Sequence, residues 1–303
     1  MYDILSNSIN VDALIIGKGP AGLQAAIYLA RAGFAAAVVG HDAGSLALAE
    51  KIENYYGQAE PLSGADLQRI GEAQAQSFGI TLYGEQVTGF GFGDDGSYNV
   101  NTTAHEFTAK TILMATGAKR AKAPIKGIEA FEGFGVSYCA VCDGFLYRGK
   151  EVGVLGSGEY AFSEASELAA IIGRVTIFTN GETPMFGVKP SDLNPDKFEV
   201  VSEPVKSLEG NGALTGIRFQ NGGLYPLDGL FIAYGTAGSA DLAKKLGVLL
   251  TERGDVVTDR DQATNVPGVF AAGDCTGVFR QIAVAAGQGA VAARTMIEYM
   301  RRK

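Results

Sequence analysis

The segment VDALIIGKGPAG, residues 11–22, joins an apolar run to a turn that contains three glycines. A helical pattern rich in alanine and leucine follows the turn and ends at Gly33. A second apolar run, Phe34–Val39, ends at Gly40. A strand, a glycine turn, a helix and a second strand within about 30 residues predict a β-α-β unit of the dinucleotide-binding kind.

Each glycine of the first turn has a physical reason. Gly17 permits a tight turn, Gly19 lets the backbone approach a pyrophosphate, and Gly22 lets the helix pack close to its strand. The pyrophosphate would then lie at the helix N-terminus, where free N–H groups and the helix dipole favour an anion. The position of the motif between strand and helix predicts nucleotide binding. The ribose contact stays open, because Gly40 stands where an acidic residue often ends the second strand.

The same design recurs later in the chain. The apolar run Glu151–Leu155 leads into the turn GSGEYA, residues 156–161, which is followed by a helical pattern and by the strand Val175–Phe178. Two copies of the unit predict an α/β fold with two Rossmann-like domains. The glycine-rich segments Gly84–Tyr98 and Gly210–Leu224 have alternating apolar residues, and we expect them to form β-hairpins.

The second domain is expected to be inserted into the first. Two further apolar runs end in sharp turns, one at Thr111–Gly117 and one at Val266–Asp274. They predict that the first domain continues after the second has been completed. We therefore expect residues 1–120 and 246–303 to form one domain and residues 121–245 to form the other.

Composition excludes several function classes. The chain has 303 residues, a net charge of −8 and 47% hydrophobic residues. The acidic balance argues against nucleic-acid and anionic-membrane partners. No apolar run approaches the ~18 residues of a membrane-spanning helix, and the N-terminus lacks the features of a signal peptide. With three cysteines, a reducing cytoplasm is the expected compartment.

Cys139-Ala-Val-Cys142 is followed directly by Asp143. Two thiols at this spacing can close a small disulfide ring, which suits reversible two-electron chemistry. A zinc site is disfavoured, because the chain has no second pair of this kind and only two histidines, so no metal is expected. A pair of inert buried cysteines is the other alternative to a redox dithiol. Two readings of Asp143 stay open, a proton donor and acceptor or a helix cap. Cys275 is expected to be a small core residue rather than a third redox thiol.

Taken together, these motifs resemble the low-molecular-weight thioredoxin reductases over nearly the whole chain. The resemblance rests on four segments: the first glycine turn, Ala115-Thr-Gly117, GVSYCAVCDGF at residues 135–145, and Ala271-Ala-Gly-Asp274. The resemblance implies a homodimer that binds FAD. Cys142 would face the flavin, Cys139 would attack the disulfide of a thioredoxin-like protein, and Asp143 would be the acid. The FAD contacts would be Gly17, Gly19, Pro20, Ala21, Gly22, Gly40, Ser45, Leu46, Asn54, Thr116, Gly117, Gly273, Asp274, Arg280, Gln281, Ile282 and Ala283.

The second domain departs from the family pattern. The family carries His-Arg-Arg-x-x-x-Arg there to hold NADPH, whereas this chain has Thr179, Asn180, Gly181 and Met185 at those positions, with Glu182 among them. The chain is therefore most similar to pyridine-nucleotide-independent members, which include ferredoxin-linked enzymes and diflavin-linked disulfide oxidoreductases. Whether a second FAD, a weakly bound NAD(P)H or nothing binds the second turn stays open. Its contact residues would be Gly156, Gly158, Glu159, Tyr160 and Ala161.

The expected function is FAD-dependent dithiol–disulfide exchange with a thioredoxin-like partner, without NADPH and with ferredoxin as a candidate donor. Three alternatives stay open: an NAD(P)H-dependent thioredoxin reductase with weakened nucleotide specificity, a flavin-bound redox sensor without turnover, and, least favoured, a ferredoxin:NADP reductase of similar fold.

Overall fold

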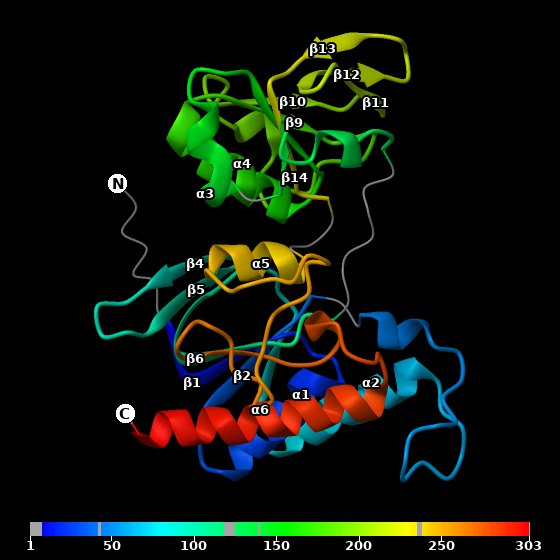
Figure 1. Ribbon diagram of the computed structural model, residues 1–303, viewed down its shortest axis with the longest axis vertical. Helices are drawn as coiled ribbons and strands as arrows, with labels where there is room; N and C mark the ends of the chain where they lie inside the picture. The colour runs from blue at the N-terminus through cyan, green and yellow to red at the C-terminus, as the bar shows by residue number, and fades with distance from the viewer. Residues whose placement is uncertain (1–7, 42–43, 118–124, 139, 235–237, 303) are drawn as a thin grey trace. The chain divides into compact units, whose positions relative to one another are not determined.

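The computed structural model describes residues 8–41, 44–117, 125–138, 140–234 and 238–302 (Figure 1). It divides into two compact units, Met1–Arg120 with Gly238–Lys303, and Ala121–Ala237. The chain returns to the first unit at residue 238 and not at 246 as expected. The difference arises because α5 (Ser239–Lys245) packs on the first unit, where the Lys245 ammonium donates to the carbonyl of Thr88 over 3.0 Å. An apolar strand pattern does not reveal such a short helix.

The first unit is built on one mixed sheet. Across the sheet the strands are β3 (Thr81–Tyr83), β2 (Ala36–Val39), β1 (Ile9–Ile16), β6 (Glu106–Met114), β5 (Tyr98–Thr102) and β4 (Val87–Phe92), while β15 (Val269–Ala271) also pairs with β6. β1 pairs in parallel with β2, as the β-α-β pattern predicts, and its other edge pairs in parallel with β6. β4 and β5 form a hairpin at the first expected place, but its second strand continues to Thr102, beyond the expected end at Tyr98.

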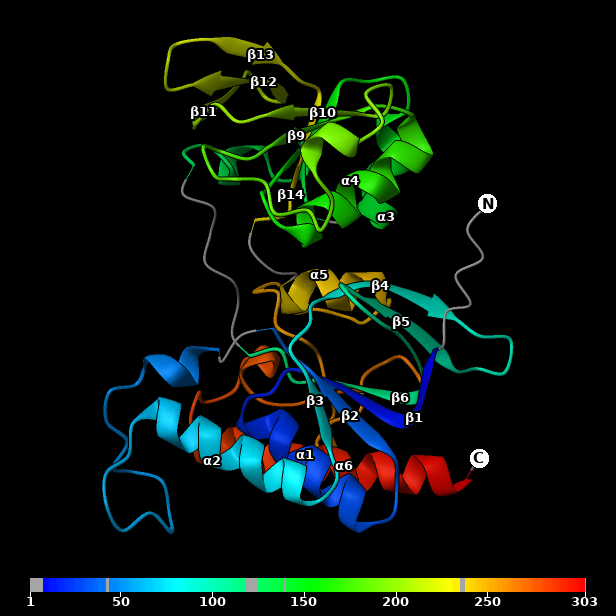
Figure 2. The ribbon, with the colours of Figure 1, turned by 180° about the vertical axis from the view of Figure 1, so that it is seen from behind.

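Three helices cover one face of this sheet, namely α1 (Pro20–Arg31), α2 (Gly64–Ser77) and α6 (Ile282–Arg302) (Figures 1 and 2). Small residues let α1 and α6 approach closely. A Cβ added to Gly289 would lie only 2.1 Å from the carbonyl oxygen of Ala21, so no larger residue fits there. Ala292 and Ala293 of α6 are fully buried in the same core. The close packing places the start of α6 near the first glycine turn. Two single turns of 3-10 helix, η1 (Ser45–Leu48) and η5 (Asp274–Thr276), complete this unit.

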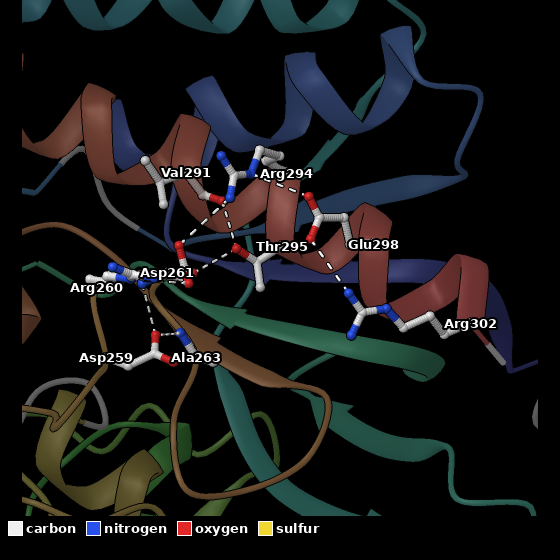
Figure 3. Close-up of polar contacts among 9 residues, drawn as sticks. All are labelled: Asp259, Arg260, Asp261, Ala263, Val291, Arg294, Thr295, Glu298 and Arg302. Atoms are coloured by element: carbon white, nitrogen blue, oxygen red, sulfur yellow. Dashed lines mark hydrogen bonds and ion pairs between the residues drawn. The ribbon is translucent and has the colours of Figure 1, made fainter.

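α6 is also tied to the loop before β15 (Figure 3). The Thr295 hydroxyl donates to the carbonyl of Asp261 over 2.7 Å. Within the loop, the Asp259 carboxylate accepts from the amides of Asp261 and Ala263, each over 2.9 Å. Arg294 lies 3.7 Å from the Asp261 carboxylate and 3.4 Å from that of Glu298. These contacts fix the helix to the strand that precedes Gly273.

The second unit has its own sheets and core. Its parallel sheet runs in the order β10 (Phe198–Val201), β9 (Val175–Phe178), β8 (Val152–Leu155), β14 (Gly229–Ile232) and β7 (Val136–Ser137). An antiparallel sheet contains β11 (Val205–Gly210), β12 (Leu214–Phe219) and β13 (Leu224–Pro226), and thus includes the second expected hairpin. The helical segments are α3 (Ala140–Asp143), α4 (Glu159–Ile172), η2 (Glu129–Phe131), η3 (Gly144–Tyr147) and η4 (Pro190–Asp192). β8, the glycine turn, α4 and β9 form the second β-α-β unit, as predicted.

Among the described residues, no helix is both long enough and apolar enough to cross a membrane.

Candidate active site

The first glycine turn has the geometry that its spacing predicts. Gly17 has φ +115°, and a Cβ there would lie 2.1 Å from the carbonyl oxygen of Ala115. A Cβ on Gly22 would lie 2.0 Å from the carbonyl oxygen of Gly17. At Gly19, by contrast, an added Cβ would meet nothing within 4 Å, so this side of the turn is open. No side chain of the described residues caps α1 at Gly19, and its first-turn amides are available to an anion.

The ends of three parallel strands meet at this turn. The amide of Ala115 donates to the carbonyl of Ile16 over 2.8 Å. This bond extends the pairing of β6 with β1 up to the glycine turn. Gly273 follows β15, and a Cβ there would lie 3.0 Å from Cβ of Ala21. The structure thus brings together the glycine turn, the segment from Ala115 to Gly117 and the segment that begins at Gly273. This is the edge at which parallel α/β sheets bind ligands.

Asp274 lies at this edge as the first residue of η5. Burial raises the pKa of its carboxyl above the usual range, and the positive charge of Arg280 opposes that shift. Two other predicted contacts also meet, because the Asn54 amide donates to the side-chain oxygen of Gln281 over 3.1 Å. Ile282 opens α6 directly after Gln281.

Three other predicted FAD residues lie after β2 and in η1. The amide of Gly40, at the end of β2, donates to the carbonyl of Tyr83 over 2.9 Å. Ser45 and Leu46 form η1, where a Cβ on Gly64 would lie 1.7 Å from the carbonyl oxygen of Leu46.

Two glutamines support this edge and were missed from the sequence. Gln288 of α6 accepts from the amide of Gly273 over 2.8 Å. Gln68 of α2 donates to the carbonyl of Lys18 over 2.6 Å and is 4% exposed. A glutamine on an amphipathic helix gives no signal in the sequence, because only the tertiary fold shows which backbone group it reaches.

Cys275 is a core residue, as expected. It is 2% exposed, and its thiol donates to the carbonyl of Ala272 over 3.3 Å. Burial raises the pKa of this thiol to about 11, so it is protonated at neutral pH. A buried protonated thiol is a poor nucleophile.

The redox segment lies in the second unit. Cys139 lies outside the described residues, and Cys142 belongs to α3, although its side chain is not described. Asp143 ends α3, and its carboxylate accepts a hydrogen bond from the Ser137 hydroxyl over 2.6 Å. It makes no side-chain cap at the start of η3, so the capping interpretation of this residue is wrong. Burial, with the Asp143 charge as a second cause, raises the pKa of Tyr147.

The second glycine turn keeps its backbone geometry. Gly156 has φ +158°, and a Cβ there would lie 2.2 Å from the carbonyl oxygen of Ala233. Ala161 and Tyr160 are fully buried on α4. Gly158 precedes Glu159, the first residue of α4.

The segment after β9 folds back on this second turn. The amide of Met185 donates to the carbonyl of Ser157 over 2.7 Å. The Glu182 carboxylate accepts from the hydroxyls of Ser157 and Tyr234. The bond to Glu182 raises the pKa of Tyr234, with burial as a further cause. The Glu182 carboxylate is therefore hydrogen-bonded to the second glycine turn.

Among the described residues, no three side chains of histidine, cysteine, aspartate or glutamate are grouped to hold a metal ion.

Comparison with known proteins identifies the family. The model of the pyridine nucleotide-disulphide oxidoreductases matches residues 11–289. The thioredoxin reductase of Aquifex aeolicus (strain VF5) is 35% identical and aligns over 96% of this chain and 94% of its own length. The atypical thioredoxin reductase TRi from Desulfovibrio vulgaris Hildenborough is 44% identical, with a TM-score of 0.89 over 97% of this chain and 99% of that chain. A ferredoxin-flavin thioredoxin reductase from Clostridium acetobutylicum is 29% identical, with a TM-score of 0.71 over 98% of this chain and 100% of that chain. This chain therefore belongs to the pyridine nucleotide-disulphide oxidoreductase family and is a flavin disulfide oxidoreductase of the thioredoxin reductase type.

Proposed function

We propose that this enzyme reduces the disulfide of a thioredoxin-like protein through Cys139 and Cys142, and that its electrons do not come from NADPH. The observation that carries the disulfide chemistry is the acid that follows Cys142 in the chain. Asp143 ends the helix that contains Cys142, and the Ser137 hydroxyl holds its carboxylate at 2.6 Å. A fixed carboxyl group next to a dithiol can take up and return the protons that accompany its redox cycle.

The residues of the first unit fit FAD. The open side at Gly19 and the uncapped start of α1 suit the pyrophosphate. Asp274 offers a carboxylate to sugar-alcohol hydroxyls, and the Asn54–Gln281 pair offers amide groups to a flavin ring. When bound and reduced by a donor, the flavin of FAD would supply the two electrons that open the enzyme disulfide.

Transfer to the partner is thiol–disulfide exchange. The Cys139 thiolate attacks one sulfur of the partner disulfide, which forms a mixed disulfide and releases the other partner sulfur as a thiol once it takes a proton. Cys142 then attacks Cys139, so that the enzyme disulfide forms again and the second partner sulfur leaves and is protonated. Asp143 is placed next to Cys142 in the chain to move these protons.

The second turn argues against NADPH. A 2′-phosphate needs basic side chains at the end of the second strand, and here Thr179 is fully buried while Glu182 is bonded to Ser157. The Glu182 charge would repel a phosphate brought to this turn. Ferredoxin is a candidate donor, since one of the similar structures is a ferredoxin-flavin thioredoxin reductase. A second FAD lacks the 2′-phosphate and stays a candidate for this turn, which a count of one flavin per chain would exclude. We further propose that the enzyme is a homodimer in the cytoplasm.

A transfer assay tests the role of the cysteines. The holoenzyme is reduced with dithionite, freed of excess reductant and mixed anaerobically with an oxidised thioredoxin, whose new thiols are then counted by alkylation. Cys139→Ser should transfer no electrons and keep its flavin absorbance. Cys275→Ser is the matched control and should transfer as the unaltered enzyme does. Wild-type transfer by Cys139→Ser would refute the assignment.

A further inference from the structure

A buried carboxyl group lies against the redox segment in the second unit. Glu164 of α4 is 1% exposed, and its oxygen Oε2 accepts from the backbone amide of Ala140 over 2.9 Å. Ala140 is itself fully buried and is the first residue of α3. Its amide nitrogen belongs to the peptide bond that joins it to Cys139. Glu164 therefore holds the backbone between the two cysteines.

The same face of α4 also supports the other end of the redox segment. Gly144 follows Asp143 directly, and a Cβ there would lie 3.0 Å from Leu168 and 3.1 Å from Ile171. Glu164, Leu168 and Ile171 are four and three residues apart on α4, so they share one helix face. One face of α4 thus contacts α3 at its first residue and the chain just beyond its last residue.

The polar contact is unusual for this face. Glutamate is almost never fully buried unless it is paired, because removing its charge from water is costly. An apolar residue here would pack against α3 without that cost. The presence of a carboxyl group at this point indicates a role beyond packing.

We propose that Glu164 is a positioning residue that lowers the reduction potential of the Cys139–Cys142 disulfide. The inference rests on the proposed function, since it assumes that this pair cycles. The amide of Ala140, which follows Cys139 in the chain, already donates to Glu164 and is therefore less available to stabilise a thiolate of that cysteine. The carboxylate charge also disfavours a thiolate close to it. Both effects destabilise the reduced dithiol relative to the disulfide and so lower the reduction potential. A dithiol with a lower potential is a stronger reductant of a partner.

Glu164→Gln tests this charge. Glutamine has nearly the same volume and keeps an oxygen acceptor for Ala140, but it carries no charge. The holoenzymes are equilibrated in mixtures of reduced and oxidised dithiothreitol. Each disulfide that is reduced takes two electrons and two protons from one dithiol, which becomes the cyclic disulfide. The samples are quenched by alkylation, and the labelled fraction of Cys139 and Cys142 is measured by mass spectrometry.

We expect the equilibrium constant for reduction to rise about tenfold in Glu164→Gln, which is about 30 mV for a two-electron couple. Flavin absorbance should not change, because the FAD residues lie in the other unit. Glu209→Gln is the matched control. Its carboxylate pairs with Arg218 in the antiparallel sheet of the same unit, and the constant should not move.

The possible outcomes distinguish a failure of the role of Glu164 from a failure of the proposed function. A Glu164→Gln variant that melts at a lower temperature but keeps the wild-type constant would show a merely structural role and overturn the inference. If this variant does not fold, Glu164→Asp is measured instead. Its shorter side chain should lose the bond to Ala140 and raise the constant by a smaller factor, and an unchanged constant would likewise overturn the inference. A wild-type pair that does not cycle at all would overturn the proposed function and the inference with it.

Discussion

Two side chains contact the segment around the cysteines: the Ser137 hydroxyl donates to Asp143, and the Glu164 carboxylate accepts from the amide of Ala140. The positions of Gly17, Gly22 and Gly156 were predicted from spacing, because a left-handed φ or a close backbone approach leaves room for glycine alone. Ser137 and Glu164 were not predicted as site residues. A serine in a strand and a glutamate on a helix are ordinary residues until the fold shows that both contact the segment around the cysteines.

Ser137→Ala tests whether the hydroxyl orients the acid. Without the 2.6 Å bond the Asp143 carboxyl loses its fixed orientation. General acid–base catalysis contributes about 10²–10⁴-fold, and we expect the variant to lose about tenfold in kcat for thioredoxin reduction. KM for the partner should not change, because Ser137 is buried and is not expected to contact the partner.

Ser207→Ala is the control for this change. The Ser207 hydroxyl also donates to a carboxylate, that of Glu209 over 3.1 Å, but in β11. We expect wild-type kcat from it. A Ser137→Ala enzyme with unchanged kcat would show that Asp143 needs no such support.

At the level of elements, the sequence predicted both β-α-β units and both hairpins. Strand ends were predicted less well: β1 begins at Ile9 and not at Val11, and β6 begins at Glu106, five residues before the expected run at Thr111–Gly117. The apolar periodicity carries this information, because each strand and helix buries one face. The short α5 and the support of α6 by the loop at residues 259–263 were not predicted, since they depend on contacts between distant segments.

The loop before β15 should matter more for stability than the ion pairs on α6. Asp259→Ala removes the acceptor for two amides, and we expect it to lower the free energy of unfolding by about 1–2 kcal/mol. Glu298→Gln breaks only exposed pairs with Arg294 and Arg302 and should cost less than about 0.5 kcal/mol.

The melting temperatures of the Asp259→Ala and Glu298→Gln holoenzymes are compared with that of the unaltered enzyme by thermal unfolding. Asp259→Asn keeps a side-chain oxygen acceptor and should recover most of the loss. A larger drop in Tm for Glu298→Gln than for Asp259→Ala would contradict this account of how α6 is anchored.

At the level of the whole molecule, two dinucleotide-binding-like units with separate cores share one chain. The first unit keeps an open glycine turn, with Gly19 free of neighbours on one side. The second keeps the turn but attaches Glu182 to it. The sequence predicted the loss of the basic residues, whereas the hydrogen bonds of Glu182 to Ser157 and Tyr234 could be found only from the fold, because they join segments 25 and 52 residues apart.

Anaerobic mixing of the oxidised holoenzyme with NADPH tests the central claim most directly. The flavin absorbance band is followed after mixing, and dithionite is added at the end to show that the flavin can be reduced. We expect the band to persist with NADPH in excess and to bleach only with dithionite. Fast bleaching by NADPH would contradict the account, because it would mean that the second unit binds the nucleotide despite Glu182 and without basic residues at Asn180 and Gly181.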